Sequence, residues 1–158
     1  KTSGINPTLL NAVEEVNAEQ LEQIILMIKQ KLGDLASKKI TILGTAFKPD
    51  TDDIRDSIAI ELIKKLLKKK AKIIIHDPKA MKNTQRIFEE KINYAKTIED
   101  ALSKSHCVII MTQWKQYTKL NNNQFKYMTK KFVIDCRRML VKKQLDVDYI
   151  AIGLGKEN

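Results

Sequence analysis

The stretch Lys39–Phe47, KITILGTAF, begins the strand–helix–strand pattern that decides the fold. Its apolar run ends at Gly44 and predicts a short buried strand. Ser57–Lys70 then carries apolar residues at helical spacing, and Ala71–Pro78, AKIIIHDP, predicts a second strand. Two strands joined by a helix form a βαβ unit, in which the strands run parallel. The pattern therefore indicates a parallel sheet with helices packed on it.

The rest of the chain continues this alternation of strands and helices. Further strands are expected near residues 92–95 and at residues 106–112, 131–136 and 149–153, with helices over about residues 97–103 and 122–129 and a polar connection up to Glu90. Strands that read as unbroken apolar runs are typical of a parallel sheet covered on both faces. The expected fold class is α/β, with a Rossmann-like, doubly wound, mainly parallel sheet flanked by helices.

One long helix is expected before the α/β unit. Proline in Asn6-Pro7-Thr8 suits a helix start, and apolar residues follow at helical spacing until Gly33. The helix would run for about 25 residues, which is long for a globular domain. We therefore divide the chain into residues 1–36, a helical segment, and residues 37–158, the α/β domain.

The composition is that of a folded globular chain. Its 158 residues are 43% apolar and 30% charged, far from the disordered or fibrous extremes. No apolar run approaches the roughly 20 residues of a membrane span, and the acidic, polar start is unlike a signal peptide. Cys107 and Cys136 have no metal-binding spacing. We expect a cytoplasmic location, no membrane partner and no metal site.

The net charge of +10 raises the question of an anionic partner. The lysines are spread over several short runs near expected helix ends, with few aromatic residues among them for base stacking. A solvated surface is the plainer interpretation. A basic nucleic-acid-binding module stays open as an alternative class of function.

The expected strand order locates a ligand crevice. In the common order 3-2-1-4-5-6, the sheet reverses direction between the strand at residues 39–43 and the strand at residues 107–111. Ligands of such sheets bind beyond the carboxyl ends of the strands at that reversal. The candidate site is therefore built by residues 44–55, 112–114 and 136–138.

The loop in this crevice, Gly44–Ser57 or GTAFKPDTDDIRDS, is unusually rich in charge. It lacks the glycine pattern of a dinucleotide loop, so a phosphate there would be met by Lys48 as a point charge. Its aspartates approach the amino end of the next helix, which Asp56 or Ser57 can cap, and one of them can hold Arg55. A helix-capping loop with solvated ion pairs is the alternative interpretation.

The same loop resembles the signature of the UDP-glucose/GDP-mannose dehydrogenase family, Gly-Leu-Ala-Phe-Lys-Pro-Asp-Thr-Asp-Asp-x-Arg-Glu-Ser-Pro-Ala. Four other segments, NPTLLNAVEEVNAEQ, IIIHDPKAM, VIIMTQWKQY and VIDCRRML, resemble family segments in the family's order. In that family an amino-terminal domain binds NAD, a central helical region makes the dimer, and a carboxyl-terminal domain binds UDP. The resemblance identifies residues 1–36 as the end of the dimerisation region and residues 37–158 as the UDP-sugar-binding domain.

The resemblance implies a parent enzyme that oxidises UDP-glucose to UDP-glucuronate in two NAD-dependent steps, for polysaccharide biosynthesis. The family's nucleophilic cysteine lies in a Gly-Gly-x-Cys segment that does not occur here. We therefore assign no catalytic residue and expect the chain alone to be inactive, with NAD bound mainly by a domain absent from it. Expected partners are a UDP-sugar and a second copy in a homodimer. A UDP-N-acetylhexosamine or GDP-mannose 6-dehydrogenase is the alternative, although DTDDIR favours UDP-glucose.

Residue by residue, the resemblance implies that Phe47, Lys48 and Arg137 contact the substrate and that Arg55 reaches NAD. The alternative for Arg137 is an ion pair with Asp135. Trp114 is interpreted as packing at the edge of the site, with a stacking platform as the alternative.

Two departures from the family pattern lie next to Arg137. Cys136 replaces a glycine and Arg138 replaces an asparagine. If the glycine has a positive φ or admits the ligand closely, the side chain of Cys136 would shift Arg137 or crowd the site. Elsewhere, Cys107 is expected to be a core residue, and neither His76 nor His106 is assigned a catalytic role.

Overall fold

A computed structural model describes residues 8–152, with side chains from Glu19 onward except that of Lys143. The chain forms two compact units that divide between Gly33 and Asp34. The first unit contains helix α1, Thr8–Leu32, which confirms the predicted long helix. It ends at Gly33, where φ is +73° and the N–H donates to the carbonyl oxygen of Lys29 at 2.8 Å. The expected start at Asn6-Pro7 lies outside the described residues.

The second unit is built on a parallel sheet. Its strands are β1 Lys39–Leu43, β2 Lys72–His76, β3 Asn93–Tyr94, β4 Cys107–Ile110, β5 Phe132–Asp135 and β6 Asp148–Ala151. Their order in the sheet is β3-β2-β1-β4-β5-β6, with every neighbouring pair parallel. The predicted fold class and the predicted order of strands are both confirmed.

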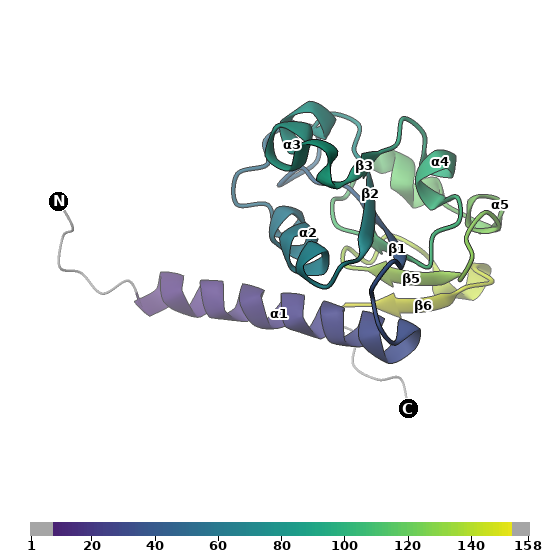
Figure 1. The fold of residues 1–158 in the computed structure, drawn as a ribbon, viewed down its shortest axis with the longest axis horizontal. Helices are drawn as coiled ribbons and strands as arrows, with labels where there is room; N and C mark the ends of the chain where they lie inside the picture. Colours follow the sequence, from purple (N-terminus) through teal and green to yellow (C-terminus); the bar gives the residue numbers. More distant parts are fainter. Residues whose placement is uncertain (1–7, 153–158) are drawn as a thin grey trace. The chain divides into compact units, whose positions relative to one another are not determined.

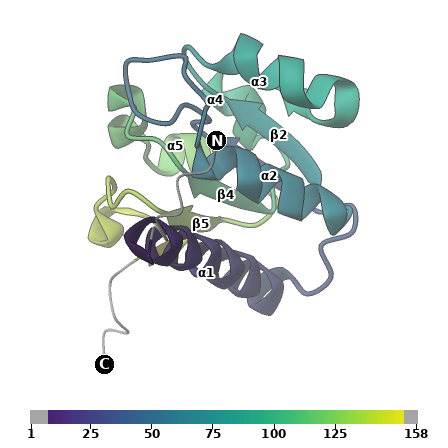
Figure 2. The same ribbon diagram turned by 90° about the vertical axis from the view of Figure 1, so that its left-hand side faces the viewer.

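Helices cover both faces of this sheet. The helices are α2 Ile58–Lys68, α3 Met81–Phe88, α4 Ile98–Leu102 and α5 Asn122–Phe125, joined by the short 3-10 turns η1 Glu89–Lys91, η2 Lys115–Lys119 and η3 Lys142–Gln144. In Figure 1, α2 and α3 lie on one side of strand β2 and α4 and α5 on the other. Figure 2 looks onto the sheet from the first side, with α2 in front of β4. All residues of β4 and β5 are buried, as expected of central strands in a sheet covered on both faces.

Two expectations about the helices were wrong. The polar stretch before Glu90 was expected to connect two strands without a helix. It contains helix α3. Its inward positions are Thr84 and Phe88, so a polar residue replaces one of the apolar residues that reveal a helix by their spacing. The helix expected over residues 122–129 ends at Phe125, after one turn that begins with a capping box of Asn121 and Gln124.

The turn after β1 requires a glycine for two reasons. Gly44 has a φ of +90°, and a Cβ built there would lie 2.5 Å from Cβ of Thr112. The positive φ would strain any other residue. The absence of a Cβ lets the turn after β1 lie in close contact with Thr112, after β4. This close approach sets the floor of the crevice.

We predict that Gly44→Ala lowers the free energy of unfolding by about 3 kcal/mol or more, because left-handed strain and overpacking add. Gly33→Ala is the matched control: Gly33 has a φ of +73° but nothing within 4 Å of its Cβ position, so only strain of about 1–2 kcal/mol applies. Urea unfolding followed by circular dichroism measures both. Equal losses would contradict the role of the contact with Thr112.

Candidate functional site

The three loops predicted to form the crevice meet at one edge of the sheet. Beyond β1, the carbonyl oxygen of Ala46 accepts a hydrogen bond from Oγ1 of Thr112 at 2.7 Å. Beyond β5, Nε of Arg137 donates to the carbonyl oxygen of Met111 at 2.6 Å. Nε2 of Gln113 donates to the carbonyl oxygen of Arg137 at 3.5 Å. The bonds of Thr112 and Gln113 thus join residues 44–55, 112–114 and 136–138 across the reversal of strand order, as the sequence predicts.

A buried carboxylate at the end of β2 organises the first of these loops. Asp77 is 3% exposed. Its Oδ2 accepts from the N–H groups of Thr45 at 2.7 Å and Ala46 at 3.0 Å, and from Nε1 of Trp114 at 3.2 Å. Its Oδ1 accepts from the N–H groups of Lys79 at 2.9 Å and Ala80 at 2.7 Å. One side chain therefore joins the loops that follow β1, β2 and β4.

A second buried carboxylate, Asp135 at the end of β5, organises the turn that carries Arg137. Oδ1 of Asp135 accepts from the N–H of Arg137 at 2.9 Å, and Oδ2 accepts from the N–H groups of Met139 and Leu140 at 2.7 and 3.0 Å. Oη of Tyr149 donates to the same Oδ2 at 2.9 Å, and burial raises the pKa of this phenol well above its usual range. The turn that carries Arg137 is thus wrapped around Asp135.

Sequence reasoning missed Asp77 and gave Asp135 only a minor part. Each is the first carboxylate after an apolar strand, in IIIHD and FVID. A charge directly after a buried run must find partners, because burying it without partners is costly. That position in the sequence was the available signal.

The loop after β1 leaves its predicted ligand residues accessible. Phe47 is 52% exposed and Lys48 is also exposed. The N–H of Phe47 donates to the carbonyl oxygen of Asp53 at 2.8 Å, which closes the base of the loop. The side chains are therefore presented on a backbone that is closed at residues 47 and 53.

Arg55 is held by an aspartate, as expected. Its Nη2 lies 2.7 Å from Oδ2 of Asp53, and its Nε is within 3.2 Å of both oxygens. This hydrogen bonding lowers the pKa of Asp53 to about 2, with a smaller contribution from the charge of Lys48. The Arg55 side chain is still 86% exposed.

The expected helix cap is not formed by a side chain. Ser57 occupies the N-cap position of α2 and makes no side-chain capping bond, while Asp56 has a left-handed φ of 57°. The side chains of Asp52 and Asp53 do accept hydrogen bonds, from Asn83 of α3 and from Arg55 within the loop. The loop is therefore built to shape itself more than to cap a helix.

Arg137 makes a different contact from the ion pair that the sequence left open. The Asp135 carboxylate is used by main-chain N–H groups and by Tyr149, whereas the Arg137 side chain donates to Met111. The residue is exposed at the rim. Its guanidinium thus lies between the ends of β4 and β5.

The backbone strain considered for Cys136 is not present. Cys136 does not have a positive φ, and its N–H donates to the carbonyl oxygen of Ile110 at 3.1 Å. Its thiol is largely buried, which raises the pKa to about 12. The left-handed residue is Arg138, with a φ of 54°. Asparagine, which the family resemblance places there, tolerates this conformation better than arginine.

We predict that Arg138→Asn raises the free energy of unfolding by about 0.5–1 kcal/mol by relieving left-handed strain. Lys126→Asn is the control, because Lys126 has an ordinary φ of −59° and should gain nothing. Thermal and urea unfolding measure both variants. A loss on Arg138→Asn would mean that the arginine side chain makes a stabilising contact that outweighs the strain.

Several residues considered at the sequence level are part of the core. Trp114 is 5% exposed and bonded to Asp77, which supports packing over a stacking platform. His76 is buried, its Nδ1 lies 2.9 Å from Oη of Tyr117, and burial lowers its pKa. Cys107 is fully buried, as expected. None of these side chains is accessible enough to meet a ligand directly.

We predict that Asp77→Asn lowers the free energy of unfolding by about 3 kcal/mol, since the amide presents one acceptor and two donors to a set of N–H donors. Asp146→Asn is the control, because Asp146 is 80% exposed and its carboxylate forms a surface ion pair with Lys131. The free energy of unfolding of this control variant should fall by no more than about 0.5 kcal/mol. Urea unfolding compares the two, and equal effects would refute the role given to Asp77.

Two depressions of the α/β unit can be compared with the predicted crevice. One of about 600 Å³ separates the loop after β1 from the start of α3 and is lined by Asp50, Thr51, Asp52, Pro78, Lys79, Met81 and Lys82. Another, of about 610 Å³, is lined by Lys39, Lys72, Ile73, Ile74, Asn93, Tyr94, Ala95, Lys96 and Asp100.

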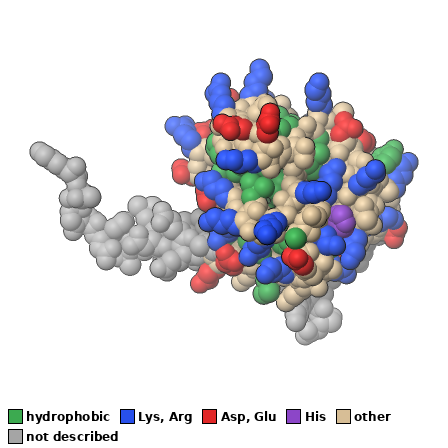
Figure 3. All heavy atoms as spheres, viewed as in Figure 1, with side chains coloured by type: hydrophobic (Ala, Val, Ile, Leu, Met, Phe, Trp, Pro, Cys, Tyr) green, Lys and Arg blue, Asp and Glu red, His purple; other side chains and the backbone are tan. Residues whose placement is uncertain are grey.

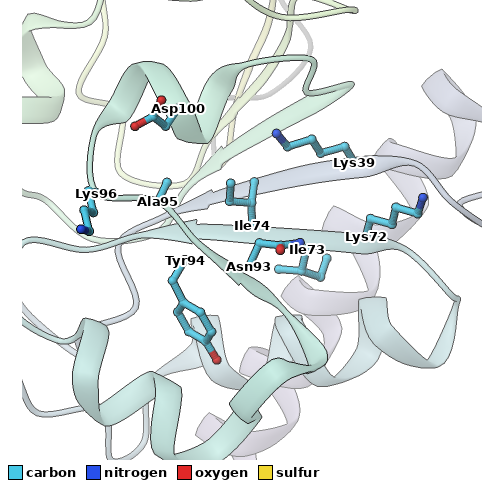
Figure 4. Close-up of a pocket in the computed structure, with 9 residues that line it drawn as sticks. All are labelled: Lys39, Lys72, Ile73, Ile74, Asn93, Tyr94, Ala95, Lys96 and Asp100. Carbon is cyan, nitrogen blue, oxygen red and sulfur yellow. The ribbon is translucent and has the colours of Figure 1, made fainter.

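The second depression is not the predicted crevice. Lys39 and Lys72 open β1 and β2, so they lie at the amino ends of these strands. Figure 4 shows that the lysine side chains do not converge on one point. Nζ of Lys39 donates to the carbonyl oxygen of Ser103 at 2.5 Å, so this cation is engaged within the fold. We therefore place the candidate site at the carboxyl ends of the strands.

Two further findings concern what the described residues contain. Among the side chains that the structure describes, from Glu19 to Ile152 without Lys143, no group of three or more His, Cys, Asp or Glu is arranged to hold a metal ion. Within residues 8–152, no helix combines the length and the apolar character that crossing a membrane requires.

The sheet, its crevice at the strand reversal and the exposed cations on its rim define a Rossmann-like α/β domain with a ligand site of the kind found in doubly wound folds. Residues 41–142 match the UDP binding domain of the UDP-glucose/GDP-mannose dehydrogenase family. The chain belongs to this family.

Individual relatives agree with this assignment. The chain is 36% identical to UDP-glucose 6-dehydrogenase AglM of Haloferax volcanii, over 94% of this chain and 34% of the relative. It is 32% identical to UDP-glucose 6-dehydrogenase of Rickettsia conorii, over 94% of this chain and 36% of the relative. The chain thus spans about a third of the length of the curated relatives that it matches.

Solved structures show the same fold. A UDP-glucose dehydrogenase from Pyrobaculum islandicum superposes with a TM-score of 0.77 and 30% identity, over 88% of this chain and 31% of that chain. The UDP-N-acetyl-mannosamine dehydrogenase Cap5O from Staphylococcus aureus superposes with a TM-score of 0.76 at 22% identity, over 96% of this chain and 35% of that chain. The second likeness concerns the fold alone.

Proposed function

We propose that this chain is the UDP-sugar-binding portion of an NAD-dependent UDP-glucose 6-dehydrogenase. The observation that carries the proposal is an exposed cation, Lys48, in the loop after β1 at the strand reversal of a UDP binding domain. The parent reaction oxidises the C6 alcohol of UDP-glucose to a carboxylate with NAD. Two relatives named for this activity match over most of the chain.

In this proposal the chain supplies binding energy from the part of the substrate that does not react. Lys48 meets the diphosphate, where a compact ammonium group acts as a point charge. Phe47, which is 52% exposed, offers an apolar surface beside it, and Arg137 meets the substrate from the other side of β4. Binding of the remote nucleotide orients the sugar for hydride transfer, which lowers the entropic part of the barrier.

Arg55 has the properties of a residue that serves a second domain. Its side chain is 86% exposed, yet the bidentate bond to Asp53 fixes its direction. We infer that it reaches NAD held by a domain outside this sequence. The nucleophilic cysteine of the parent protein lies in a Gly-Gly-x-Cys segment upstream of the long helix, which this sequence does not contain, so this chain alone should not oxidise the sugar.

The remaining proposals concern assembly and context. Residues 1–36 are the end of the central helical region, through which the parent enzyme forms a homodimer, and residues 37–158 are the UDP-sugar-binding domain. The enzyme acts in the cytoplasm in polysaccharide biosynthesis. The family also includes enzymes that act on GDP-mannose and UDP-N-acetylhexosamines. We prefer UDP-glucose as the substrate because of the relatives' names and the DTDDIR segment.

A nucleic-acid-binding role has less support. On the face in Figure 3, lysine and arginine side chains are dispersed and acidic side chains lie among them. Phosphate-backbone binding favours a continuous basic stripe. The net charge of +10 is the observation that supports a nucleic-acid-binding role.

We predict that the chain binds UDP more tightly than GDP and that Lys48→Ala weakens UDP binding at least about tenfold, since a charge-assisted bond contributes about 1.5–3 kcal/mol. Lys72→Ala is the matched control, because this exposed lysine begins β2 at the other end of the sheet. Isothermal titration calorimetry with UDP, GDP and a short DNA duplex measures the affinities.

Three results would count against the proposed function: no binding of UDP, equal weakening by both lysine variants, or tighter binding of DNA with a steep dependence on salt. The last result would favour the electrostatic module.

A further inference from the structure

We propose that Asn83 of helix α3 is a positioning residue that holds the loop carrying Lys48 and Arg55. The inference rests on the proposed function for its link to UDP, but its structural part is independent of any ligand. Helix α3 is the element that the sequence did not reveal. It is attached to the loop after β1 at three levels.

The deepest level is the Asp77 carboxylate. Oδ2 accepts from the N–H groups of Thr45 and Ala46 at the start of the loop, and Oδ1 accepts from those of Lys79 and Ala80 before α3. Both segments are thereby fixed to the end of β2. This level sets where the loop and the helix begin.

The middle level is a pair of buried hydroxyl groups. Oγ1 of Thr84 lies 2.8 Å from Oγ1 of Thr45 and 2.9 Å from the carbonyl oxygen of Ala80. Both threonines are fully buried. The contact fixes the rotation of α3 about its axis, because Thr84 can lie against Thr45 in only one orientation of the helix. Because Asn83 precedes Thr84, the same contact sets the direction in which the Asn83 side chain leaves the helix, which is toward the loop after β1.

The outer level reaches the middle of the loop. Nδ2 of Asn83 donates to the carbonyl oxygen of Asp52 at 2.8 Å and to its carboxylate at 3.1 Å. Nζ of Lys79 donates to the carbonyl oxygen of Asp50 at 3.2 Å. Asp50 has a left-handed φ of 65°, a conformation that a non-glycine residue keeps only where its surroundings hold it.

Of the two outer contacts, that of Asn83 is the better built. Its side chain is short, and the amide makes two hydrogen bonds to the loop. Arg86 sets the orientation of this amide, because its Nη1 donates to Oδ1 of Asn83 at 3.2 Å. Lys79 makes one long bond through a flexible side chain. Ordering a lysine costs more side-chain entropy than ordering an asparagine. Asn83 is therefore the main outer support.

The position of this support explains why it matters. Lys48 and Arg55 are exposed and lie on either side of residues 50–52, so their placement depends on the loop backbone. A loop held in its binding conformation loses less entropy when a ligand binds. Removing Asn83 should leave the fold intact but allow residues 50–52, and the two cations with them, to move.

The test uses the full chain and Asn83→Ala. We expect hydrogen exchange of the Phe47 amide, which is bonded to Asp53 across the loop, to become at least about fivefold faster, and UDP binding to weaken about threefold to tenfold, as loss of a net hydrogen bond implies. The free energy of unfolding measured in urea should fall by no more than about 1.5 kcal/mol, the contribution of one net hydrogen bond. Gln85→Ala, at an exposed position on the same helix, should alter none of these quantities.

A pair exchange separates positioning from a general effect on α3. Asn83→Asp places a carboxylate against that of Asp52 and should speed exchange more than Asn83→Ala. Adding Asp52→Asn restores a side-chain donor and acceptor with reversed roles and should recover part of the lost protection and affinity. A merely structural role for Asn83 in the helix would not be rescued by a change at Asp52.

The outcomes distinguish this inference from the proposed function. Unchanged exchange in Asn83→Ala overturns the inference. Faster exchange with unchanged UDP affinity, while Lys48→Ala weakens binding, overturns the link between positioning and binding. If UDP does not bind, or Lys48→Ala has no effect, the proposed function fails, and the exchange measurement still decides whether Asn83 holds the loop.

Discussion

The buried carboxylate of Asp77 is the constraint on which the rest of the site depends. A charge at 3% exposure is stable only when hydrogen-bonded, and here its partners come from the loops after β1, β2 and β4. Satisfying one anion therefore fixes three loops that are far apart in the sequence. The same carboxylate leaves Trp114 no role as an exposed platform, because its indole N–H is one of the partners.

Asp135 repeats this device on the other side of β4. The two carboxylates hold the floor of the crevice rigid with main-chain N–H groups, while the cations Lys48, Arg55 and Arg137 lie above it at the surface. This arrangement separates two tasks. Buried anions shape the backbone, and exposed cations remain available to an anionic ligand such as a sugar nucleotide. A preorganised site of this kind binds without paying for loop ordering at each encounter.

Much of the fold could be predicted because its strands are apolar runs. KITIL, KIIIH, CVII and FVID are buried almost throughout, so their hydrophobicity identifies them, and alternation with helices implies a parallel sheet. Gly44, the only glycine in the loop, marked the turn at the crevice. The three loops of the site followed from strand order alone. The family resemblance then supplied roles for Phe47, Lys48, Arg55 and Arg137.

The sequence by itself thus determined the class of fold, the edge of the sheet where the site lies and the family. Only the tertiary structure decided how the site is held. Helix α3 is concealed because its inward Thr84 breaks the apolar spacing and bonds a residue 39 positions away. The strain belongs to Arg138, not Cys136, because the turn wraps around Asp135. Hydrogen bonds between polar groups distant in the chain leave no periodic signal, whereas burial of apolar residues does.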